Sequence, residues 1–330
     1  MKSKLKVTAL VAAIATALSG AALSGAAQAQ TKMTYLFPAP DFLPAFSPFQ
    51  IARHKGYYKA EGLEPTFQVG KGGADVAKQV GVGNADLGGG IGDTAIIVRA
   101  NGVEVRGVAL LGARTLTQIT VREDSGIKSL KDLKGKKIGV LAFQDTTFYN
   151  LLGAMRSAGL SRDDANVQAV GAAGVVQLMI SGDLNAISGV PEWTAGIEAA
   201  GVKVNVFEIE PVFPAMAQAI LASDKVLKEK PDMVRAFVRA TLKGLKEVID
   251  NPEQASKDYV AAVPQHAGKE KQMEGIMRRY GTLVYGPASA NLGKFDEKRL
   301  AAVQKFYVDN QIVQTAVPIK DTYTNDMVGN

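Results

Sequence analysis

Short apolar runs alternate with amphipathic segments over the first two thirds of the chain. Nine runs have the length and residue content of β-strands. They cover residues 33–37, 65–69, 85–89, 103–111, 119–123, 136–142, 166–170, 185–190 and 202–209. Between them apolar residues recur at helical spacing, as at Phe148, Leu151 and Met155. This alternation predicts an α/β protein with mixed, mostly parallel sheets in Rossmann-like lobes, covered by helices on both faces.

From Pro231 onward the strand pattern stops and only helical periodicity remains. One long apolar face begins after Pro231-Asp232 and ends at Asn251-Pro252. Its members are Val234, Phe237, Val238, Thr241, Leu242, Leu245, Val248 and Ile249. We therefore expect a helical C-terminal part.

A weak internal repeat indicates two similar lobes. The segments GNADLG (83–88) and GDLNAI (182–187) share a glycine, a turn-forming Asp or Asn and then a strand of small residues. Roughly 300 residues also exceed one comfortable hydrophobic core. We predict a discontinuous first lobe of residues 30–117 and 218–330 and a second lobe of 118–217. The chain would cross between them at 119–123 and return at 213–223, which makes a hinge around a ligand cleft.

The N-terminus has the pattern of a secretory signal. Lys2, Lys4 and Lys6 precede an apolar segment, and Ala27-Gln28-Ala29 fits a small-residue cleavage site. The apolar segment is shorter than the roughly 20 residues that span a bilayer, so a membrane anchor is the weaker interpretation. We expect residues 1–29 to be a signal peptide cleaved after Ala29, leaving an exported, periplasmic protein.

Charge and cysteine content narrow the classes of function. The 38 Lys and Arg against 32 Asp and Glu become 35 against 32 without the signal lysines, a net charge too small to indicate nucleic-acid binding. The chain has no cysteine, which excludes disulfides, thiol catalysis and a cysteine-linked lipid anchor. We expect a monomer without a lipid anchor.

Five loops follow predicted strands and would face the cleft if those strands are parallel. PAPDFLPAF (38–46) could present Asp41, Phe42 and Phe46, or be a rigid connector with its aromatic rings in the core. VGKGGAD (69–75) and GGGIGDT (88–94) are glycine-rich turns before helices, which suit a small polar or anionic solute held by backbone amides. Neither has the spacing of a nucleotide motif.

The remaining loops lie in the second lobe. In FQDTTFYNLL (143–152) a Thr or Asp can cap a helix while a neighbouring hydroxyl faces the cleft. GAAG (171–174) and GVPEWT (189–194) form the fifth site, with Pro191 in the first helical turn, a carboxylate at Glu192 and the only tryptophan at Trp193. An isolated tryptophan also fits a core position.

The residues of the chain give little support for a catalytic site. Only His54 and His266 are present, both in polar surroundings, and neither metal-ligand spacing nor a nucleophile elbow occurs. We expect no enzyme activity, no metal and no cofactor.

Two blocks resemble a known family. IARHKGYYKAEGLEPTFQVGKGG with VGNADLG, and SGIKSLKDLKGKKIGV (125–140), resemble the signatures of periplasmic solute-binding proteins of ABC importers for nitrate, sulfonates, taurine and thiamine-pyrimidine precursors. Physically these blocks are fold determinants: Ser129 caps a turn that buries Leu130 and Leu133, and Gly62 ends a helix before Leu63. They indicate the architecture better than the solute.

The resemblance implies a type II periplasmic binding fold that closes on a solute and delivers it to an inner-membrane ABC permease. Carried over by position, together with the loops above, it implies these ligand-binding residues: Asp41, Phe42, Gly72, Gly73, Gly92, Asp93, Thr94, Gln144, Thr146, Thr147, Ala172, Ala173, Glu192 and Trp193. Pyrimidine-synthesising enzymes of similar fold rely on a histidine and a cysteine-rich motif. This chain has no cysteine and no comparably placed histidine.

The solute stays open at this stage. Few cations stand in the candidate loops while Asp41, Asp93, Asp145 and Glu192 add negative charge, so an inorganic anion is disfavoured. Phe42, Phe46, Phe143 and Trp193 could line an apolar surface. A small organic acid or sulfonate, aromatic ones included, is our leading hypothesis, and a thiamine-type pyrimidine or other amine heterocycle is the alternative. A different class of function is a ligand-binding input protein for a membrane sensor.

Overall fold

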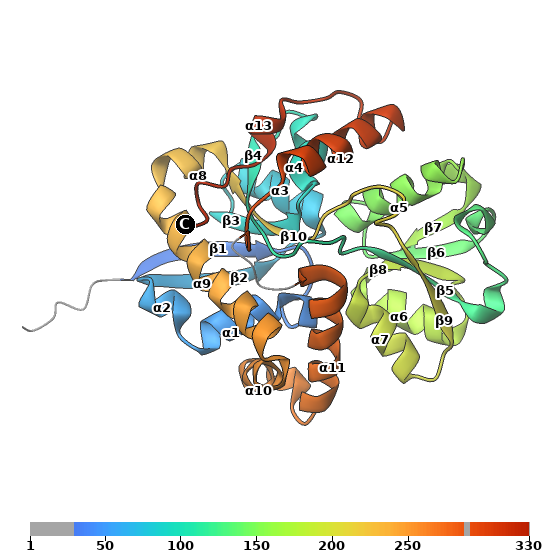
Figure 1. The fold of residues 1–330 in the computed structure, drawn as a ribbon, viewed down its shortest axis with the longest axis horizontal. Helices are drawn as coiled ribbons and strands as arrows, with labels where there is room; N and C mark the ends of the chain where they lie inside the picture. The colour runs from blue at the N-terminus through green and yellow to red at the C-terminus, as the bar shows by residue number, and fades with distance from the viewer. Residues whose placement is uncertain (1–29, 287–290, 330) are drawn as a thin grey trace, which may run out of the picture.

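The computed structural model describes residues 30–286 and 291–329. The predicted signal peptide, residues 1–29, lies outside the described residues. Figure 1 shows two lobes, each built around one sheet, with the C-terminal helices α9 and α10 against the lobe that contains the N-terminal strand. Within the described ranges, no helix has the length and apolar content needed to cross a membrane.

The first lobe contains a five-stranded sheet with the order β2-β1-β3-β10-β4. Its strands are β1 (Thr31–Phe37), β2 (Leu63–Val69), β3 (Leu87–Ile91), β4 (Val105–Leu110) and β10 (Gln218–Ser223). β1 pairs in parallel with β2 and β3, whereas β10 is antiparallel to both β3 and β4. Four strands therefore run in one direction and β10 runs in the other.

The second lobe repeats this plan, with a sheet of order β7-β6-β8-β5-β9. Its strands are β5 (Gln118–Arg122), β6 (Lys137–Val140), β7 (Asn166–Ala169), β8 (Ala186–Gly189) and β9 (Val204–Glu208). β5 is the antiparallel strand here, between β8 and β9. The segments of the weak internal repeat lead into β3 and β8, which occupy equivalent places in the two sheets.

All nine predicted strands are present, and the fold class is as expected. The structure adds β10, a strand in the segment that we predicted only as the return crossing. Its six residues are all buried. Small residues such as Ala217, Ala219 and Ala222 give this segment little β-propensity, so only its place between β3 and β4 makes it a strand.

Helices cover both faces of the sheets. In chain order they are α1 (Ser47–His54), α2 (Tyr57–Ala60), α3 (Gly73–Gly81), α4 (Thr94–Arg99), α5 (Thr146–Ser157), α6 (Gly171–Ser181), α7 (Pro191–Ala199), α8 (Asp224–Glu229), α9 (Pro231–Asp250), α10 (Pro252–Ala262), α11 (Glu270–Tyr280), α12 (Glu297–Asp309) and α13 (Ile319–Thr322). Short 3₁₀ turns are η1 (Pro44–Phe46), η2 (Glu123–Ser125), η3 (Leu130–Leu133), η4 (Arg162–Asp164) and η5 (Pro264–His266), and a π-helical turn, η6 (Gly281–Tyr285), extends α11.

Alternating residues of β1 serve the two faces of the first sheet. Tyr35 and Phe37 both contact Phe49 of α1, with ring centroids 4.9 and 5.2 Å apart. On the other face Gly88, the sheet partner of Leu36, lies against Val76 of α3. A two-sided hydrophobic core therefore fixes the register of this strand.

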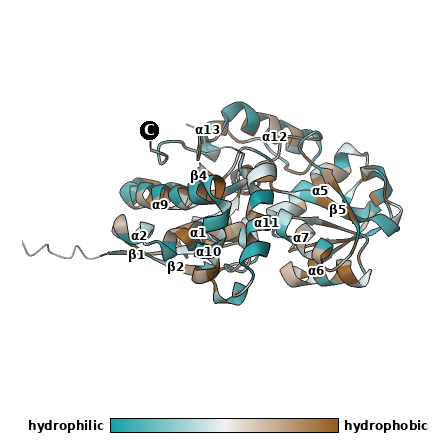
Figure 2. Ribbon diagram, turned by 60° about the horizontal axis from the view of Figure 1, so that its bottom comes forward, coloured by the Kyte–Doolittle hydropathy of each residue, from teal (hydrophilic) through white to brown (hydrophobic). Residues whose placement is uncertain are grey.

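Helix α9 has the bounds predicted from its apolar face. Phe237 on this face stacks on Tyr35 and on Tyr58, with centroid distances of 5.0 and 4.9 Å. The buried Tyr58 hydroxyl pairs with Thr241 of α9 at 2.8 Å. Figure 2 shows α9 with alternating hydrophilic and hydrophobic turns, as a helix half covered by the lobe requires.

The fold-determining turns also form as expected. Ser129 and Asp132 make a capping box around η3, and Leu133 is fully buried. Gly135 takes a left-handed conformation with φ of 71° directly before β6. The turn therefore delivers the chain into the second sheet at a defined position.

The two crossings between the sheets lie side by side and share one arginine. Residues 111–117 connect β4 to β5, and residues 209–217 connect β9 to β10. Arg299 of α12 donates to Glu210 in the second crossing at 2.8 Å and approaches the Thr115 hydroxyl in the first at 3.4 Å. The exact lobe boundaries within these crossings, at 117/118 and 217/218, stay predictions.

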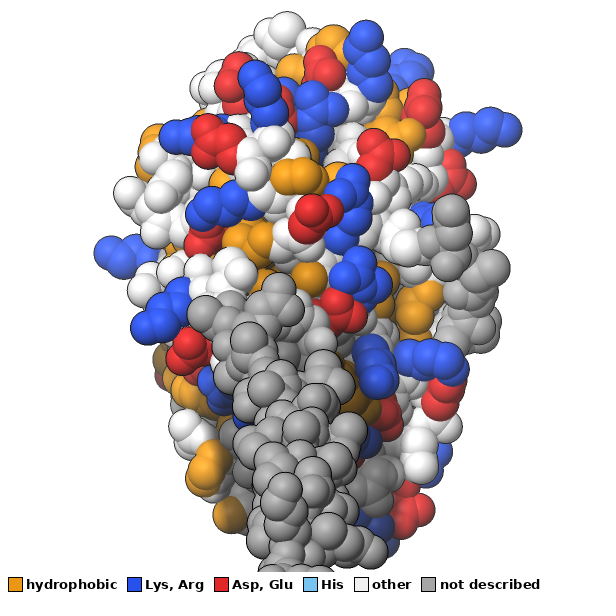
Figure 3. Space-filling view, turned by 90° about the vertical axis from the view of Figure 1, so that its left-hand side faces the viewer, with side chains coloured by type: hydrophobic (Ala, Val, Ile, Leu, Met, Phe, Trp, Pro, Cys, Tyr) orange, Lys and Arg blue, Asp and Glu red, His pale blue; other side chains and the backbone are white. Residues whose placement is uncertain are grey.

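The exterior carries charges of both signs. On the end of the molecule shown in Figure 3, Lys and Arg side chains are interspersed with Asp and Glu. Many are paired, as in Arg239 with Glu61 at 2.6 Å. The described side chains visible on this face therefore form no single-sign patch of the kind that attracts nucleic acids.

Candidate functional site

A small cavity of about 50 Å³ lies between the lobes, where the carboxyl ends of the central strands meet. It is lined mostly by apolar side chains, with a few polar groups among them. The lining residues are Pro38, Ala39, Leu43, Ala45, Phe46, Gly90, Ile91, Leu116, Leu141, Asp145, Thr146, Thr147, Val190, Glu192, Trp193 and Gln218. This volume holds only a few water molecules, so a larger solute requires the lobes to move apart.

The start of α5 forms one wall of this cavity. Asp145 is the N-cap residue, and its Oδ1 accepts from the Thr147 backbone N–H at 3.0 Å and from the Thr147 hydroxyl. Burial raises the pKa of Asp145, against hydrogen bonds from Thr147 and the Gly73 N–H that favour its ionised form. Thr146 is buried and lines the cavity. Asp145 is therefore the cap residue, and Thr146 lies beside it in the cavity wall.

The glycine-rich turn before α3 lies directly against this wall. Ala74 N–H donates to the Gln144 carbonyl at 2.9 Å, and Gly73 N–H donates to Asp145 Oδ2 at 3.2 Å. A Cβ on Gly72 would lie 2.7 Å from the Asp145 Cα, and one on Gly73 would lie 2.7 Å from the Thr146 hydroxyl oxygen. Only residues without a side chain permit this approach, and the two lobes are closed upon each other here.

Three polar atoms in the cavity wall lack partners. Glu192 Oε1, Trp193 Nε1 and Gln218 Oε1 are buried and form no hydrogen bond with the described part of the chain. The Gln218 amide nitrogen, in contrast, donates to the Ala45 carbonyl at 2.8 Å. Unpaired buried polar atoms are costly, so a bound molecule that pairs with them would be favoured.

The cavity wall carries acidic groups without basic ones. Its lining includes Asp145 and Glu192 but no Lys, Arg or His. Burial raises the pKa of Glu192 to about 7, although a hydrogen bond from Tyr280 acts in the opposite direction. The site therefore offers hydrogen-bond acceptors and, when ionised, negative charge.

A third buried carboxyl, that of Asp93, links the lobes outside the cavity lining. Asp93 is fully buried, and its Oδ2 accepts from Asn150 of α5 at 3.1 Å and from the Tyr307 hydroxyl of α12. Asn150 also donates to the Tyr307 oxygen at 2.7 Å. Burial raises the pKa of Asp93 while these two partners oppose the rise. Asp93 therefore holds the lobes together instead of facing the cavity.

The structure brings some of the predicted site residues together and leaves others apart. Thr146, Thr147, Glu192 and Trp193 line the cavity, and Gly72 and Gly73 pack against its α5 wall. The residues that do not line it are Asp41, Phe42, Gly92, Asp93, Thr94, Gln144, Ala172 and Ala173. A part for these eight in ligand binding stays a prediction.

Each of the eight has an identifiable place. The Phe42 ring is partly exposed, and its carbonyl accepts from the Tyr259 hydroxyl. The Thr94 hydroxyl accepts from the Ile91 N–H at 3.0 Å, within its own loop. The Asp41 carbonyl accepts from Gln50, and Gly92 packs on Met216. Gln144 is exposed, and Ala172 and Ala173 lie in the first turn of α6.

Sequence reasoning missed several lining residues. Leu116 and Gln218 come from the crossings, which carry no motif, and Ala39, Leu141 and Val190 are small or apolar residues of loops. Gln218 begins β10, a strand that the sequence pattern did not predict, so no motif or periodicity pointed to this residue. Phe46, which we expected either in the core or facing a ligand, does both: it lines the cavity and packs on Phe37 at 4.6 Å.

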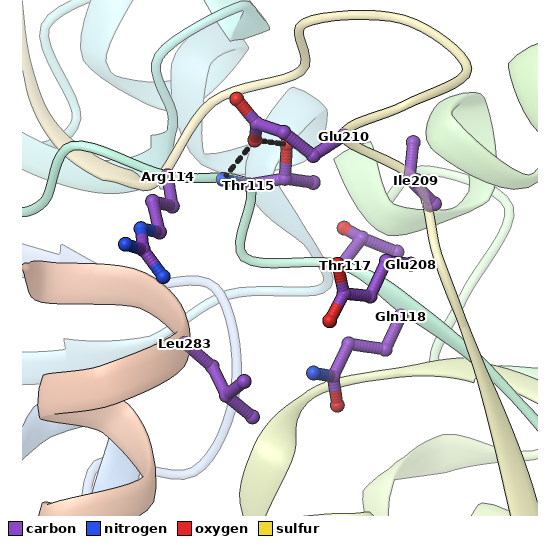
Figure 4. A pocket seen from close by; sticks show the side chains of 8 residues that line it. All are labelled: Arg114, Thr115, Thr117, Gln118, Glu208, Ile209, Glu210 and Leu283. Atoms are coloured by element: carbon purple, nitrogen blue, oxygen red, sulfur yellow. Dashed lines mark hydrogen bonds between the residues drawn. The ribbon is translucent and has the colours of Figure 1, made fainter.

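A second hollow of about 180 Å³ lies on the crossings and is shown in Figure 4. Thr115, Thr117 and Gln118 come from the first crossing and β5, and Glu208 to Glu210 from the second. Arg114 and Leu283 lie on the opposite side, and the Arg114 guanidinium donates to the Thr282 carbonyl at 2.9 Å. This hollow shares no lining residue with the central cavity.

The described residues contain no group of three or more His, Asp or Glu that could hold a metal. Neither histidine lines the central cavity. His54 ends α1, and His266 pairs through Nε2 with the Phe42 carbonyl at 2.8 Å.

Known proteins similar to this chain share its fold. The family model described as NMT1/THI5 like matches residues 43–255. Among curated proteins, the riboflavin-binding protein RibY of Chloroflexus aurantiacus is 26% identical over 314 residues, which cover 92% of this chain and 88% of RibY. A 4-amino-5-hydroxymethyl-2-methylpyrimidine phosphate synthase of Aspergillus parasiticus is 26% identical over 67% of this chain and 68% of its own length.

Among solved structures, the alkanesulfonate-binding protein SsuA of Xanthomonas axonopodis pv. citri, bound to MOPS, superposes with a TM-score of 0.67. The superposition covers 90% of this chain and 98% of SsuA, at 16% sequence identity, and it shows the shared fold alone. The fold is that of periplasmic binding proteins, as the sequence blocks indicated. Because the family model spans well over half of the chain, this protein belongs to the NMT1/THI5-like family.

Proposed function

We propose that this protein is the extracytoplasmic solute-binding component of an ABC importer. The observation that carries the proposal is the central cavity: both lobes line it, and three of its polar atoms lack partners. The likeness to RibY and to SsuA supports the same role. After cleavage of the signal peptide at Ala29, the mature protein would bind solute between its lobes and present it to a membrane permease.

The charged and hydrogen-bonding groups of the cavity wall favour one class of solute over another. An organic acid or sulfonate was the leading hypothesis from the sequence, but a buried anion needs donors or cations around it. The lining has no cationic side chain, and two of the three unpaired atoms, Glu192 Oε1 and Gln218 Oε1, are acceptors. We therefore favour a flat amine-bearing heterocycle of the thiamine-pyrimidine type, whose N–H groups would face these acceptors and whose ring nitrogen would accept from Trp193.

A thermal-shift screen of the mature protein, residues 30–330, tests this choice. The panel contains 4-amino-5-hydroxymethyl-2-methylpyrimidine, riboflavin, MOPS and benzoate. We expect the amine heterocycle to raise the melting temperature in a concentration-dependent way and the two acids to leave it unchanged. Stabilisation by MOPS or benzoate alone would support an organic acid or sulfonate as the solute instead. A lack of stabilisation by every compound would count against the proposed function.

We propose a binding role without chemistry. The relatives of this chain include a pyrimidine-synthesising enzyme, and enzymes of that kind rely on a histidine and a cysteine-rich motif. This chain has no cysteine, and neither of its histidines lines the cavity, which supports a binding role. Mass spectrometry of the probe after prolonged incubation with the protein should recover it unchanged. A converted product would show that the chain is an enzyme.

A sensor input protein would bind the same solutes, so binding assays do not distinguish it from a transport protein. The likeness to importer components favours transport. Deletion of the coding sequence should abolish uptake of the labelled solute into cells. Uptake that continues while a transcriptional response is lost would support the sensor instead.

A further inference from the structure

The Glu192 carboxyl has its two oxygens in different surroundings. Oε2 accepts a hydrogen bond from the Tyr280 hydroxyl, and Oε1 is buried and has no hydrogen-bond partner among residues 30–286 and 291–329. Glu192 also lines the central cavity, which Tyr280 does not. One oxygen thus accepts from a protein hydroxyl, whereas the other forms no hydrogen bond with the described residues, although the Ala45 backbone amide lies near the carboxyl.

The hydrogen bond to Tyr280 joins the two lobes. Glu192 belongs to α7, which packs on α6 and β9 of the second lobe. Tyr280 is the last residue of α11, which packs on α10 and α9 of the first lobe. Figure 1 shows α11 in front of the gap between the two sheets, next to α7. Opening the lobes must therefore break this bond.

Among the described residues, no Lys or Arg side chain compensates the charge of Glu192. Tyr259 of α10, Tyr280 of α11 and Tyr285 of η6 all feel its charge, and burial raises their pKa values well above the ordinary one. The Ala45 backbone amide approaches the carboxyl from η1, and Asp41 lies within electrostatic reach of Tyr259. A buried carboxyl in such surroundings depends on each hydrogen bond it can make.

We propose that Glu192 couples solute binding to lobe closure: its Oε1 accepts a hydrogen bond from the solute while its Oε2 accepts one from Tyr280 of the opposite lobe. This proposal rests on the proposed function, because it assumes a solute in the cavity. A donor on the solute would stabilise the ionised carboxyl and strengthen the second bond, to Tyr280. Binding and closure would then favour each other.

Two substitutions separate the two halves of this coupling. Tyr280→Phe removes the interlobe hydroxyl and leaves the cavity lining intact. Glu192→Gln keeps an acceptor for Tyr280 but removes the negative charge and can turn an NH₂ group toward the solute. Arg279→Gln is the matched control, because Arg279 also joins α11 to α7 through Glu198 at 2.7 Å but is solvent-exposed and away from the cavity.

Lobe closure can be measured directly because the chain has no cysteine. Cysteines introduced at Val82 and Lys203, exposed positions on opposite lobes, carry a fluorophore pair for single-molecule energy transfer. The closed fraction is measured without solute and with 4-amino-5-hydroxymethyl-2-methylpyrimidine. Calorimetry gives the dissociation constant of the same probe.

We expect Tyr280→Phe to lower the closed-to-open ratio without solute about tenfold and to weaken probe affinity by a similar factor. Glu192→Gln should weaken affinity at least tenfold while changing the solute-free ratio less than about threefold. Arg279→Gln should change both less than about twofold.

Results that differ from these expected values would overturn parts of the proposal. An unchanged closed fraction in Tyr280→Phe would overturn the interlobe role of this hydrogen bond. A lower closed fraction with unchanged affinity would overturn the coupling. If the wild-type protein binds no compound of the panel, the proposed function fails and the coupling with it, whereas the solute-free closure data still decide whether Tyr280 holds the lobes.

Discussion

Two neighbouring threonines at the start of α5 have separate tasks. Both threonines line the cavity, but the Thr147 hydroxyl donates to the N-cap carboxylate of Asp145, whereas the Thr146 hydroxyl oxygen faces Gly73 of the other lobe. The local sequence QDTT leaves these tasks interchangeable. The direction of the helix relative to the cleft assigns them.

We predict that Thr146→Val and Thr147→Val have different effects. Both replacements keep the shape and remove one hydroxyl. Thr146→Val should weaken solute affinity about tenfold with the unfolding free energy nearly unchanged, because the lost group faces the solute. Thr147→Val should lower the unfolding free energy by about 1 kcal/mol, because it removes a buried hydrogen bond to the cap. Calorimetry and urea titration measure both quantities. Equal effects of the two variants on affinity would contradict the assignment.

The raised pKa of Glu192 leads us to predict that the free energy of unfolding depends on pH. Burial raises its pKa from an ordinary value of 4.5 to about 7. The unfolded chain therefore loses this proton at lower pH than the folded protein. The favourable contribution is complete below pH 4.5 and is lost as pH rises through 7. The loss amounts to about 3.4 kcal/mol at most, at about 1.4 kcal/mol for each pH unit between the two pKa values.

The Glu192→Gln variant isolates this contribution, since glutamine does not titrate. Urea unfolding at pH 5 and pH 8 should show the wild type losing about 2 to 3 kcal/mol more than the variant over this interval. Parallel pH profiles in the two proteins would show that Glu192 titrates normally.

At the scale of elements, α12 connects the two lobes although it belongs to the helical C-terminal part. Its Tyr307 reaches both Asp93 and Asn150, and its Phe306 stacks on Phe213 of the second crossing with centroids 4.5 Å apart. Arg299 of the same helix joins the two crossings. The helix thus lies where it can stabilise the hinge region.

Tyr307→Phe should therefore destabilise the protein. The substitution takes one donor from the fully buried Asp93 and leaves Asn150 with a single partner. We expect a loss of about 1 to 3 kcal/mol in the free energy of unfolding. Tyr323→Phe is the control, because Tyr323 donates to the exposed Glu297 at 2.8 Å and should cost less than about 0.5 kcal/mol. Equal losses in urea unfolding would show that burial of the network is unimportant.

At the scale of the whole molecule, the two lobes approach each other closely at a glycine. Gly72 has φ of 101°, and a Cβ there would meet the Asp145 backbone at 2.7 Å. Backbone atoms cannot rotate out of the way as a side chain can. Any side chain at this position therefore acts on closure, besides the local strain of its positive φ.

Gly72→Ala should keep the lobes from closing fully. We expect solute affinity to fall at least tenfold and the solute-induced decrease in radius of gyration, measured by X-ray scattering, to disappear. Gly83→Ala is the matched control, since Gly83 also has a positive φ, of 85°, but has no atom within 4 Å of its would-be Cβ. Both variants bear backbone strain, so a loss of affinity shared equally by both would indicate strain rather than obstructed closure.

Much of this fold can be predicted from the local pattern of residues in the sequence. The strand from Thr31 to Phe37, the bounds of α9 and the capped turn at Ser129 all depend on neighbouring residues in the chain, and these predictions are confirmed. β10 was missed because its small residues carry no strand signal. Only the two strands on either side give it hydrogen-bond partners.

The sequence predicted which loops contribute to the candidate site, but it did not predict which side chains line it. Loops after parallel strands face the cleft, and this rule selected the segments that contain Thr146 and Glu192. It could not show that Asp93 turns toward Tyr307, more than two hundred residues later, and away from the cavity.

The sequence by itself determined the alternation of most strands and helices, the family and the loops that follow the strands, because these depend on periodicity and short motifs. The tertiary structure decided which polar groups pair with each other and which stay free. Glu192 shares one oxygen with Tyr280, and Gln218 comes from a strand without a motif. Such pairings depend on distances between segments far apart in the chain, and those distances exist only once both lobes have folded and closed.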